Sequence, residues 1–206
     1  PEATGAWQVG GHLLNEPVLV VSQKAQLIEI EQEYSVRDQN GNPIGYVKQV
    51  GQSTAKKVMR VMGNFDSMMT HHLDILDANH GFLMRITRPA KIMKSKVILQ
   101  DSQLNEIGSI QQKNMIGKIR FDLLAGGQVV GGISAENWRA WNFKVTDAQG
   151  TEVARITKKW EGMAKAMFTT ADNYVVQIHR PLDDPLRSLV VASSLCVDLA
   201  LKQNES

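Results

Sequence analysis

The stretch DPLRSLVVASSLCVDLALK, residues 184–202, predicts an α-helix that is apolar on almost every side. Asp184 suits the N-cap and Pro185 the first helical position, while Lys202 suits the negative end of the helix dipole. Such a helix is about 27 Å long and about 10 Å across. Most of the remaining chain reads as β-strands, so this helix limits how the strands can be arranged.

The predicted helix carries only a narrow polar stripe. At about 100° per residue, Arg187, Ser194 and Asp198 fall on one side. The apolar run 189–201 is shorter than the roughly 20 residues that span a bilayer, and it contains Asp198. We therefore predict burial within protein, where the polar stripe has to find partners. The expected core residues of this central helix are Leu189, Val190, Leu195, Val197 and Leu199.

The strands repeat one hairpin pattern. Alternating apolar residues lead to an aspartate, a turn and a second alternating strand, which predicts a half-buried β-hairpin. The turn aspartates are Asp38, Asp77, Asp101 and Asp147, and a degraded copy surrounds Asp122. The Asp101 copy lacks the turn glycine, and in the Asp77 copy the glycine is displaced by one residue.

These hairpins predict an antiparallel sheet. Copies spaced about 24 residues apart are too compact for βαβ units. With an early hairpin (18–22 and 26–30), they give ten to twelve strands. A closed sheet of about twelve strands leaves a lumen that an apolar helix can fill. We predict a mainly β fold, a closed antiparallel barrel of about twelve strands around a central hydrophobic C-terminal α-helix.

The domain organisation follows from the same pattern. We expect an irregular N-terminal extension at 1–16, a single barrel domain at 17–202 and a flexible tail at 203–206. Segment 53–69 could be a basic helix or a loop, and 158–171 has the apolar spacing of a short helix packed on the barrel.

Several motifs resemble the phospholipid scramblase family. They are FTTADN at 168–173, PLDD at 181–184 followed by the apolar helix, NPIGY at 42–46 and VLVVSQK at 18–24. That family is similar in turn to plant LURP-one-related proteins and to the Tubby C-terminal domain. The resemblance implies a twelve-stranded barrel with a hydrophobic helix through its middle, and it implies transbilayer phospholipid movement as an activity. The sequence shows neither the proline-rich leader nor the cysteine cluster of the lipid-moving members.

The resemblance also implies a calcium segment, which this sequence matches poorly. Thr170 stands where the family has an aspartate, and Tyr174 and Pro181 occupy other ligand positions. The resemblance therefore implies only Asp172 and Asp183 as candidate calcium ligands. Roles in a turn or a helix cap suit these two aspartates better. We expect no cofactor and no other metal site.

The charges are uneven although the net charge is only +2. Basic residues gather between positions 85 and 120, against Asp101 and Glu106. If neighbouring strands bring these basic residues onto one face, that face would suit anionic phospholipids or phosphoinositides. The alternative is that they are ordinary outward-facing strand residues in contact with water. The candidate lipid-binding residues are Arg85, Arg88, Lys91, Lys94, Lys96, Lys113, Lys118 and Arg120.

The sequence contains no catalytic constellation. His71 and His72 are adjacent, so on a strand they face opposite sides and cannot share a metal. We therefore expect no enzyme activity. The single cysteine, Cys196, excludes a disulfide framework. We expect a monomeric protein without a membrane span, cytoplasmic or peripheral at the inner face of the membrane.

Three functions remain open from the sequence. The first is a peripheral membrane protein that recognises anionic phospholipid, which we favour over autonomous scrambling because a helix shielded in a barrel offers no polar path. The second is a soluble regulatory or nucleic-acid-binding protein, with steep salt dependence of binding. The third is a small-ligand carrier that uses the barrel interior.

Overall fold

The computed structural model describes most of the chain. The described residues are 12–23, 32–50, 70–89, 96–113, 120–137, 141–158 and 173–202. The predictions for 26–30, 53–69 and 203–206 lie outside them, as do those for most of 1–16 and nearly all of 158–171. Lys91, Lys94, Lys118 and Asp172 also lie outside. The side chains from residue 197 to the end of the helix are also outside.

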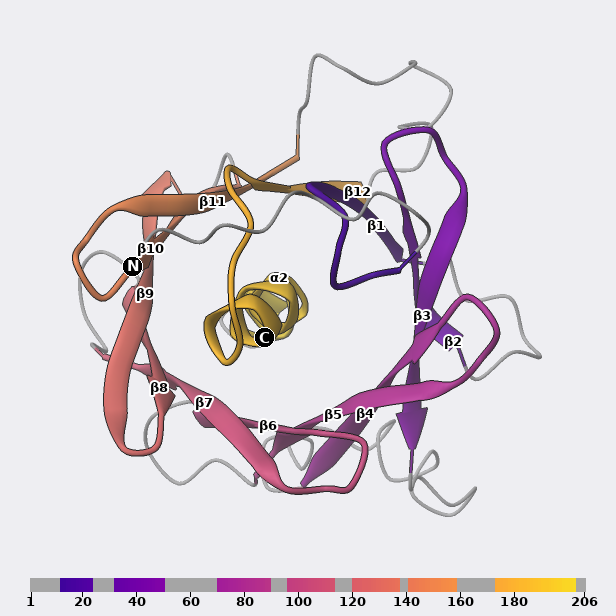
Figure 1. Cartoon of the computed structure of the whole chain (residues 1–206), viewed down its shortest axis with the longest axis horizontal. Coiled ribbons are helices and arrows are strands. Elements are labelled where there is room, and N and C mark those ends of the chain that lie inside the picture. The colour runs from indigo at the N-terminus through magenta and orange to yellow at the C-terminus, as the bar shows by residue number, and fades with distance from the viewer. Residues whose placement is uncertain are drawn as a thin grey trace.

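The described strands form a closed antiparallel barrel, as predicted (Figure 1). Each strand pairs with its neighbours in the chain, and β1 closes the barrel by pairing with β12. The strands are β1 (Val18–Gln23), β2 (Gln32–Arg37), β3 (Pro43–Val50), β4 (His71–Asp77), β5 (Phe82–Arg88), β6 (Lys96–Gln100), β7 (Glu106–Gln112), β8 (Arg120–Ala125), β9 (Gln128–Asn137), β10 (Asn142–Asp147), β11 (Glu152–Thr157) and β12 (Asn173–Ile178). The helix is α2 (Leu186–Lys202).

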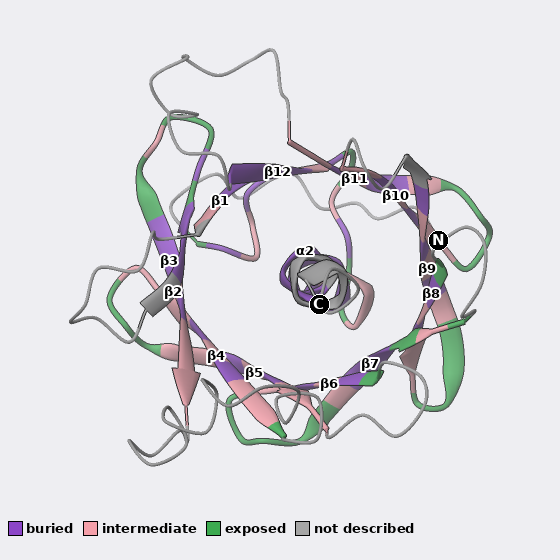
Figure 2. Ribbon diagram, turned by 180° about the vertical axis from the view of Figure 1, so that it is seen from behind, coloured by how far each residue is buried: buried purple, intermediate pink, exposed green. Residues whose placement is uncertain are grey.

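The core lies between the strands and α2. Alternate strand residues face inward, so Leu73 and Ile75 of β4 are buried while Asp74 between them is partly exposed. The inward side chains of the strands and those of α2 form one continuous buried cluster. Figure 2 shows the buried residues along the strands and on the helix, with exposed residues mainly at the hairpins.

Helix α2 runs through the barrel, as predicted (Figure 1). Leu189, Val190 and Leu195 are almost completely buried. The backbone of Val197 and Leu199 is helical, in agreement with the predicted extent of the helix.

Glycines of the wall allow α2 to pack closely. A Cβ atom on Gly108 would lie 3.2 Å from Leu189 Cδ1, and one on Gly131 would lie 3.2 Å from Leu186 Cδ1. On Gly45, a Cβ atom would lie closer still to Leu13, which precedes β1 and is buried in the core.

The helix start is held by its own polar residues. Asp184 Oδ1 accepts hydrogen bonds from the Ser188 amide (3.2 Å) and from Ser188 Oγ (2.6 Å), and Asp184 also pairs with Arg187. The Ser194 hydroxyl donates to the Val191 carbonyl oxygen at 2.8 Å. The described part of the polar stripe therefore finds its partners near or on the helix rather than on the barrel wall.

Four hairpins share one aspartate turn. In each, Asp Oδ1 accepts hydrogen bonds from the backbone amides two and four residues later, at 2.7–3.1 Å; the aspartates are Asp38, Asp77, Asp101 and Asp147. The residue three positions after each aspartate has a positive φ: Gly41 (88°), His80 (65°), Leu104 (67°) and Gly150 (82°). The aspartate, more than the glycine, is thus the constant part of the turn.

The fifth hairpin is built differently from the sequence pattern. Strands β8 and β9 are joined by Gly126 and Gly127, both with positive φ (55° and 78°), as in a two-residue hairpin turn. Asp122 lies within β8, where it pairs with Lys113. A glycine pair therefore replaces the aspartate turn.

Candidate functional site

The two ends of the barrel differ in their connections. The hairpin end contains the four aspartate turns, the Gly126–Gly127 turn and the connection from β12 to α2. At the opposite end lie the first residues of β4, β6 and β8 and the last residues of β5, β7 and β11. Helix α2 starts at the hairpin end and runs toward the opposite end.

Acidic side chains gather at the hairpin end. At strand termini and the positions next to them, they are Asp38, Asp77, Asp101, Glu106, Asp147 and Glu152, and the β12–α2 connection adds Asp183 and Asp184. The described basic residues at this end are Arg37, Arg180 and Arg187. Arg180 and Arg187 are paired with Asp147 and Asp184.

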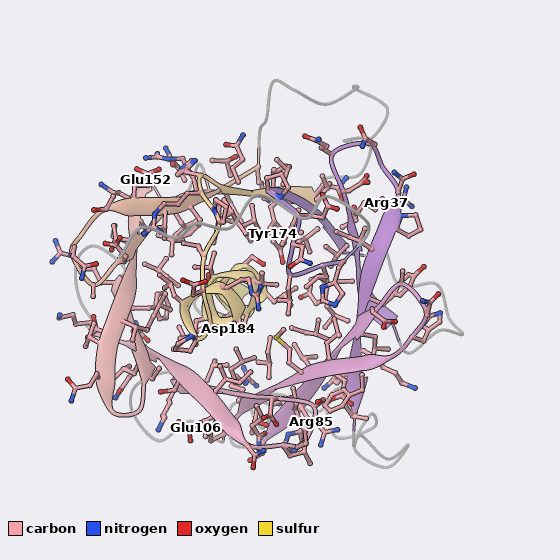
Figure 3. The ribbon with its side chains drawn as sticks, in the orientation of Figure 1. Arg37, Arg85, Glu106, Glu152, Tyr174 and Asp184 are labelled. Carbon is pink, nitrogen blue, oxygen red and sulfur yellow. The ribbon has the colours of Figure 1, made fainter. Side chains whose placement is uncertain are left out.

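At the corresponding positions of the opposite end, the charged side chains that the structure describes are Arg88, Lys96, Lys113, Arg120 and Lys158. Glu33 of β2 and Glu136 of β9 also lie one residue from strand termini at this end, and their side chains are outside the described part. We call this the basic end of the barrel. Figure 3 shows the side chains around the ring, with Arg85 and Glu106 directed away from the helix.

Three of the predicted lipid-binding residues lie together at the basic end. The Lys113 amide donates to the Arg120 carbonyl oxygen at 2.9 Å, so these residues face each other across β7 and β8. Lys96 opposes Gln111, two residues before Lys113. Lys96 and Arg120 are exposed, and 61% of the Lys113 side chain is exposed although its ammonium lies 3.4 Å from Asp122. Such exposed, long ion pairs are weak and can exchange partners.

The other described members of the predicted set lie elsewhere. Arg85 is in the middle of β5, where it forms a two-pronged pair with Asp74 at 2.6 and 2.9 Å. The hydrogen bond from Arg85 to Asp74 raises the pKa of the arginine. Arg88 opposes His71 at the end of β5 and, by alternation with Ile86, lies on the lumen side. Lys96, Lys113 and Arg120 are therefore the members that share an outer surface.

A second charged cluster, on β10 to β12, was not apparent in the sequence. Glu152 accepts two hydrogen bonds from Arg155 (2.7 and 2.8 Å), pairs with His179 at 3.2 Å and lies 3.9 Å from Lys144. Hydrogen bonding from Arg155, opposed by burial and aided by His179, lowers the pKa of Glu152 to about 2. Glu152 and Arg155 lie on β11, whereas Lys144 comes from β10 and His179 follows β12, so the strand register brings the whole cluster together.

Aromatic residues pack against one another at the basic end, beside β12. Trp141 stacks on Tyr174 with ring centroids 5.5 Å apart and meets Phe143 edge-on at 6.1 Å. The Lys158 ammonium lies 4.7 Å from the centre of the Trp141 ring, a cation–π contact. Trp141 is therefore a packing residue of the barrel that also positions Lys158.

Of the two predicted calcium residues, Asp172 lies outside the described part of the chain. Asp183 is exposed in the β12–α2 connection, and its carbonyl oxygen accepts a hydrogen bond from the Arg187 amide at 3.0 Å. Among the residues that the structure describes, no three His, Cys, Asp or Glu side chains are grouped as metal ligands would be.

The thiol of Cys196 is buried within the barrel. Burial raises the pKa of this thiol to about 12, so it is protonated and unreactive at neutral pH. Within the described residues, no helix combines the length and apolarity needed to cross a bilayer.

Comparison with known proteins gives consistent matches. A family model described as Scramblase matches residues 8–201. Altered inheritance rate of mitochondria protein 25 of Saccharomyces cerevisiae is 25% identical over 203 residues, covering 80% of this chain and 59% of the yeast protein. An X-ray structure of an Arabidopsis thaliana protein superposes with a TM-score of 0.50 at 13% identity, covering 92% of this chain and 99% of that one. The latter similarity shows a shared fold.

Proposed function

Because this chain belongs to the scramblase family, we propose that it binds anionic phospholipid head groups at a membrane surface. The observation that carries the proposal is the joint position of Lys96, Lys113 and Arg120 on the outer surface of β6 to β8. Each basic residue near an anionic membrane surface contributes about 1 kcal/mol of binding free energy. A few such residues therefore support reversible, salt-sensitive binding.

The enclosed helix favours recognition over autonomous lipid transport. Moving a head group across a bilayer requires a polar path, and α2 presents buried apolar residues to the surrounding wall. We therefore propose a non-enzymatic, peripheral protein that acts at the inner face of a membrane, where anionic lipids are enriched. Calcium is not required in this proposal, because the sequence offers few of the oxygen ligands that such a site needs.

Sedimentation with liposomes tests this function. Vesicles of phosphatidylcholine alone are compared with vesicles that also contain phosphatidylserine, at low salt and with EDTA present. We expect cosedimentation with the anionic vesicles only, and progressively weaker binding as the salt concentration rises. Equal binding to neutral and anionic vesicles would contradict the proposal, as would binding that appears only after calcium is added.

A further inference from the structure

The strongest unassigned feature of the molecule is the separation of charge along the barrel axis. The described acidic residues of the strand termini and turns lie at the hairpin end, whereas the described charged side chains at the termini of the basic end are Arg88, Lys96, Lys113, Arg120 and Lys158. The net charge of the chain is only +2, because acidic and basic residues are present in nearly equal numbers. An anionic surface would therefore attract the protein only weakly through its net charge, and would mainly orient the barrel with its basic end toward the surface.

We infer that the barrel docks end-on against an anionic bilayer, with the basic end at the lipid head groups and the hairpin end directed away. The docking residues are Lys96, Lys113 and Arg120, with Arg88 and Lys158 at the same end. This inference rests on the proposed function and specifies which surface of the barrel meets the membrane.

The dimensions of the barrel support this orientation. A strand of about six residues rises roughly 20 Å, whereas charges are screened over roughly 8–10 Å at physiological salt. With the basic end on the membrane, the aspartate turns lie beyond the screening distance and cause little repulsion. With the barrel inverted, the carboxylates of Asp38, Asp77, Asp101 and Asp147 would face the anionic lipids.

The turn carboxylates of the hairpin end are also held in place by hydrogen bonds, so they cannot easily move away from an approaching surface. Each turn aspartate is tied by backbone amides of its own hairpin, as in Asp101, whose carboxylate accepts from the amides of Gln103 and Asn105 at 2.9 Å. Hydrogen bonds from Asn105 and Gln103 outweigh the effect of burial and lower the pKa of Asp101. The Asp101 carboxylate therefore stays charged as the protein approaches the membrane.

A matched pair of charge reversals tests the orientation. Lys96→Glu alters the first residue of β6 at the basic end, and Arg37→Glu alters the last residue of β2 at the hairpin end. Both side chains are exposed, and both substitutions change the net charge equally. Binding to phosphatidylcholine–phosphatidylserine vesicles should weaken about tenfold for Lys96→Glu and less than about twofold for Arg37→Glu.

The outcomes separate the orientation from the proposed function. An equal loss of affinity in both variants would mean that net charge alone controls binding, which would overturn end-on docking and leave lipid recognition intact. If the unmodified protein does not distinguish anionic from neutral vesicles, the proposed function itself is wrong. Circular dichroism of both variants checks that the barrel remains folded.

Site-specific labelling gives a second, independent readout. The native Cys196 is buried with its thiol pKa raised to about 12, so a single introduced cysteine can be labelled selectively. Gln111→Cys at the basic end and Gln103→Cys in a hairpin turn are both exposed sites for an environment-sensitive fluorophore. Anionic vesicles should shift the emission to shorter wavelength at position 111 only. A shift at position 103, or equal shifts at both, would overturn the inference.

Discussion

Glu152 is the most heavily paired carboxylate among the described residues, with Arg155, His179 and Lys144 around it. Its pKa of about 2 lies below its ordinary value of 4.5. The charged form is therefore favoured by folding, and its contribution to stability is complete above pH 4.5. That contribution decreases as the pH falls from about 4.5 toward 2.

We expect Glu152→Gln to lower the free energy of unfolding by about 1 kcal/mol at neutral pH, since the cluster is partly exposed. The difference from the unmodified protein should shrink as the pH decreases through this window, as measured by urea denaturation at a series of pH values. Asp122→Asn is the matched control, because its pair with Lys113 is longer and more exposed. A difference for Glu152→Gln that stays constant down to pH 2 would contradict the assignment.

At the scale of single elements, the fit between α2 and the barrel wall depends on particular glycines. Gly131 and Gly132 are neighbours on β9 with opposite surroundings. A Cβ atom on Gly131 would meet the Thr146 carbonyl oxygen at 2.4 Å, whereas one on Gly132 would meet its nearest atom, the Phe121 carbonyl oxygen, at 3.4 Å. The first distance requires the backbone to move, and the second is nearly an ordinary contact.

We therefore expect Gly131→Ala to reduce the free energy of unfolding by about 1–3 kcal/mol, the usual result of overpacking. Gly132→Ala should stay within about 0.5 kcal/mol of the unmodified protein. Chemical denaturation of the two variants side by side measures the difference. Similar stabilities would show that the wall can yield around the start of α2.

The elements were the part of the structure that sequence could predict best. Alternation at Leu73 and Ile75 indicates β4, and the apolar run in residues 184–202 indicates α2, because both signals are local. The positive φ of His80 and Leu104 was not predictable from residue preference, because the Asp77 and Asp101 carboxylates impose it. Most of the candidate site depends on strand register, which a single sequence does not reveal.

At the scale of the whole molecule, the helix and the barrel share one core. The buried cluster contains residues of every strand and of α2, including Leu195, which is 2% exposed. We therefore expect Leu195→Ala to lower stability by about 2–5 kcal/mol and to shift the loss of helix and of barrel together. During urea denaturation, far-ultraviolet circular dichroism would follow the loss of the helix, and tryptophan fluorescence would follow the loss of the barrel. Separate transitions would show that the barrel can stand without its helix.

The charge separation also belongs to this scale. Composition gives a net charge of +2, and the sequence places Asp101 and Glu106 amid the basic residues of positions 85 to 120. Only the antiparallel path of the chain sorts these charges, since it returns every second strand terminus to the same end. The sequence could thus identify the basic residues as candidates, but it could not predict which of them lie at the same end of the barrel.

The seam between β1 and β12 has a consequence for biosynthesis. The first described strand, β1, is hydrogen-bonded to the last described strand, β12, through pairs such as Leu19 with Val176. While the ribosome is still making the chain, one flank of β1 lacks its permanent neighbour, and its backbone groups remain available to other polypeptides. Closing the barrel pairs strands that are far apart in the sequence, and such long-range pairing slows folding. Newly made molecules should therefore depend on chaperones for longer than helical proteins of equal size.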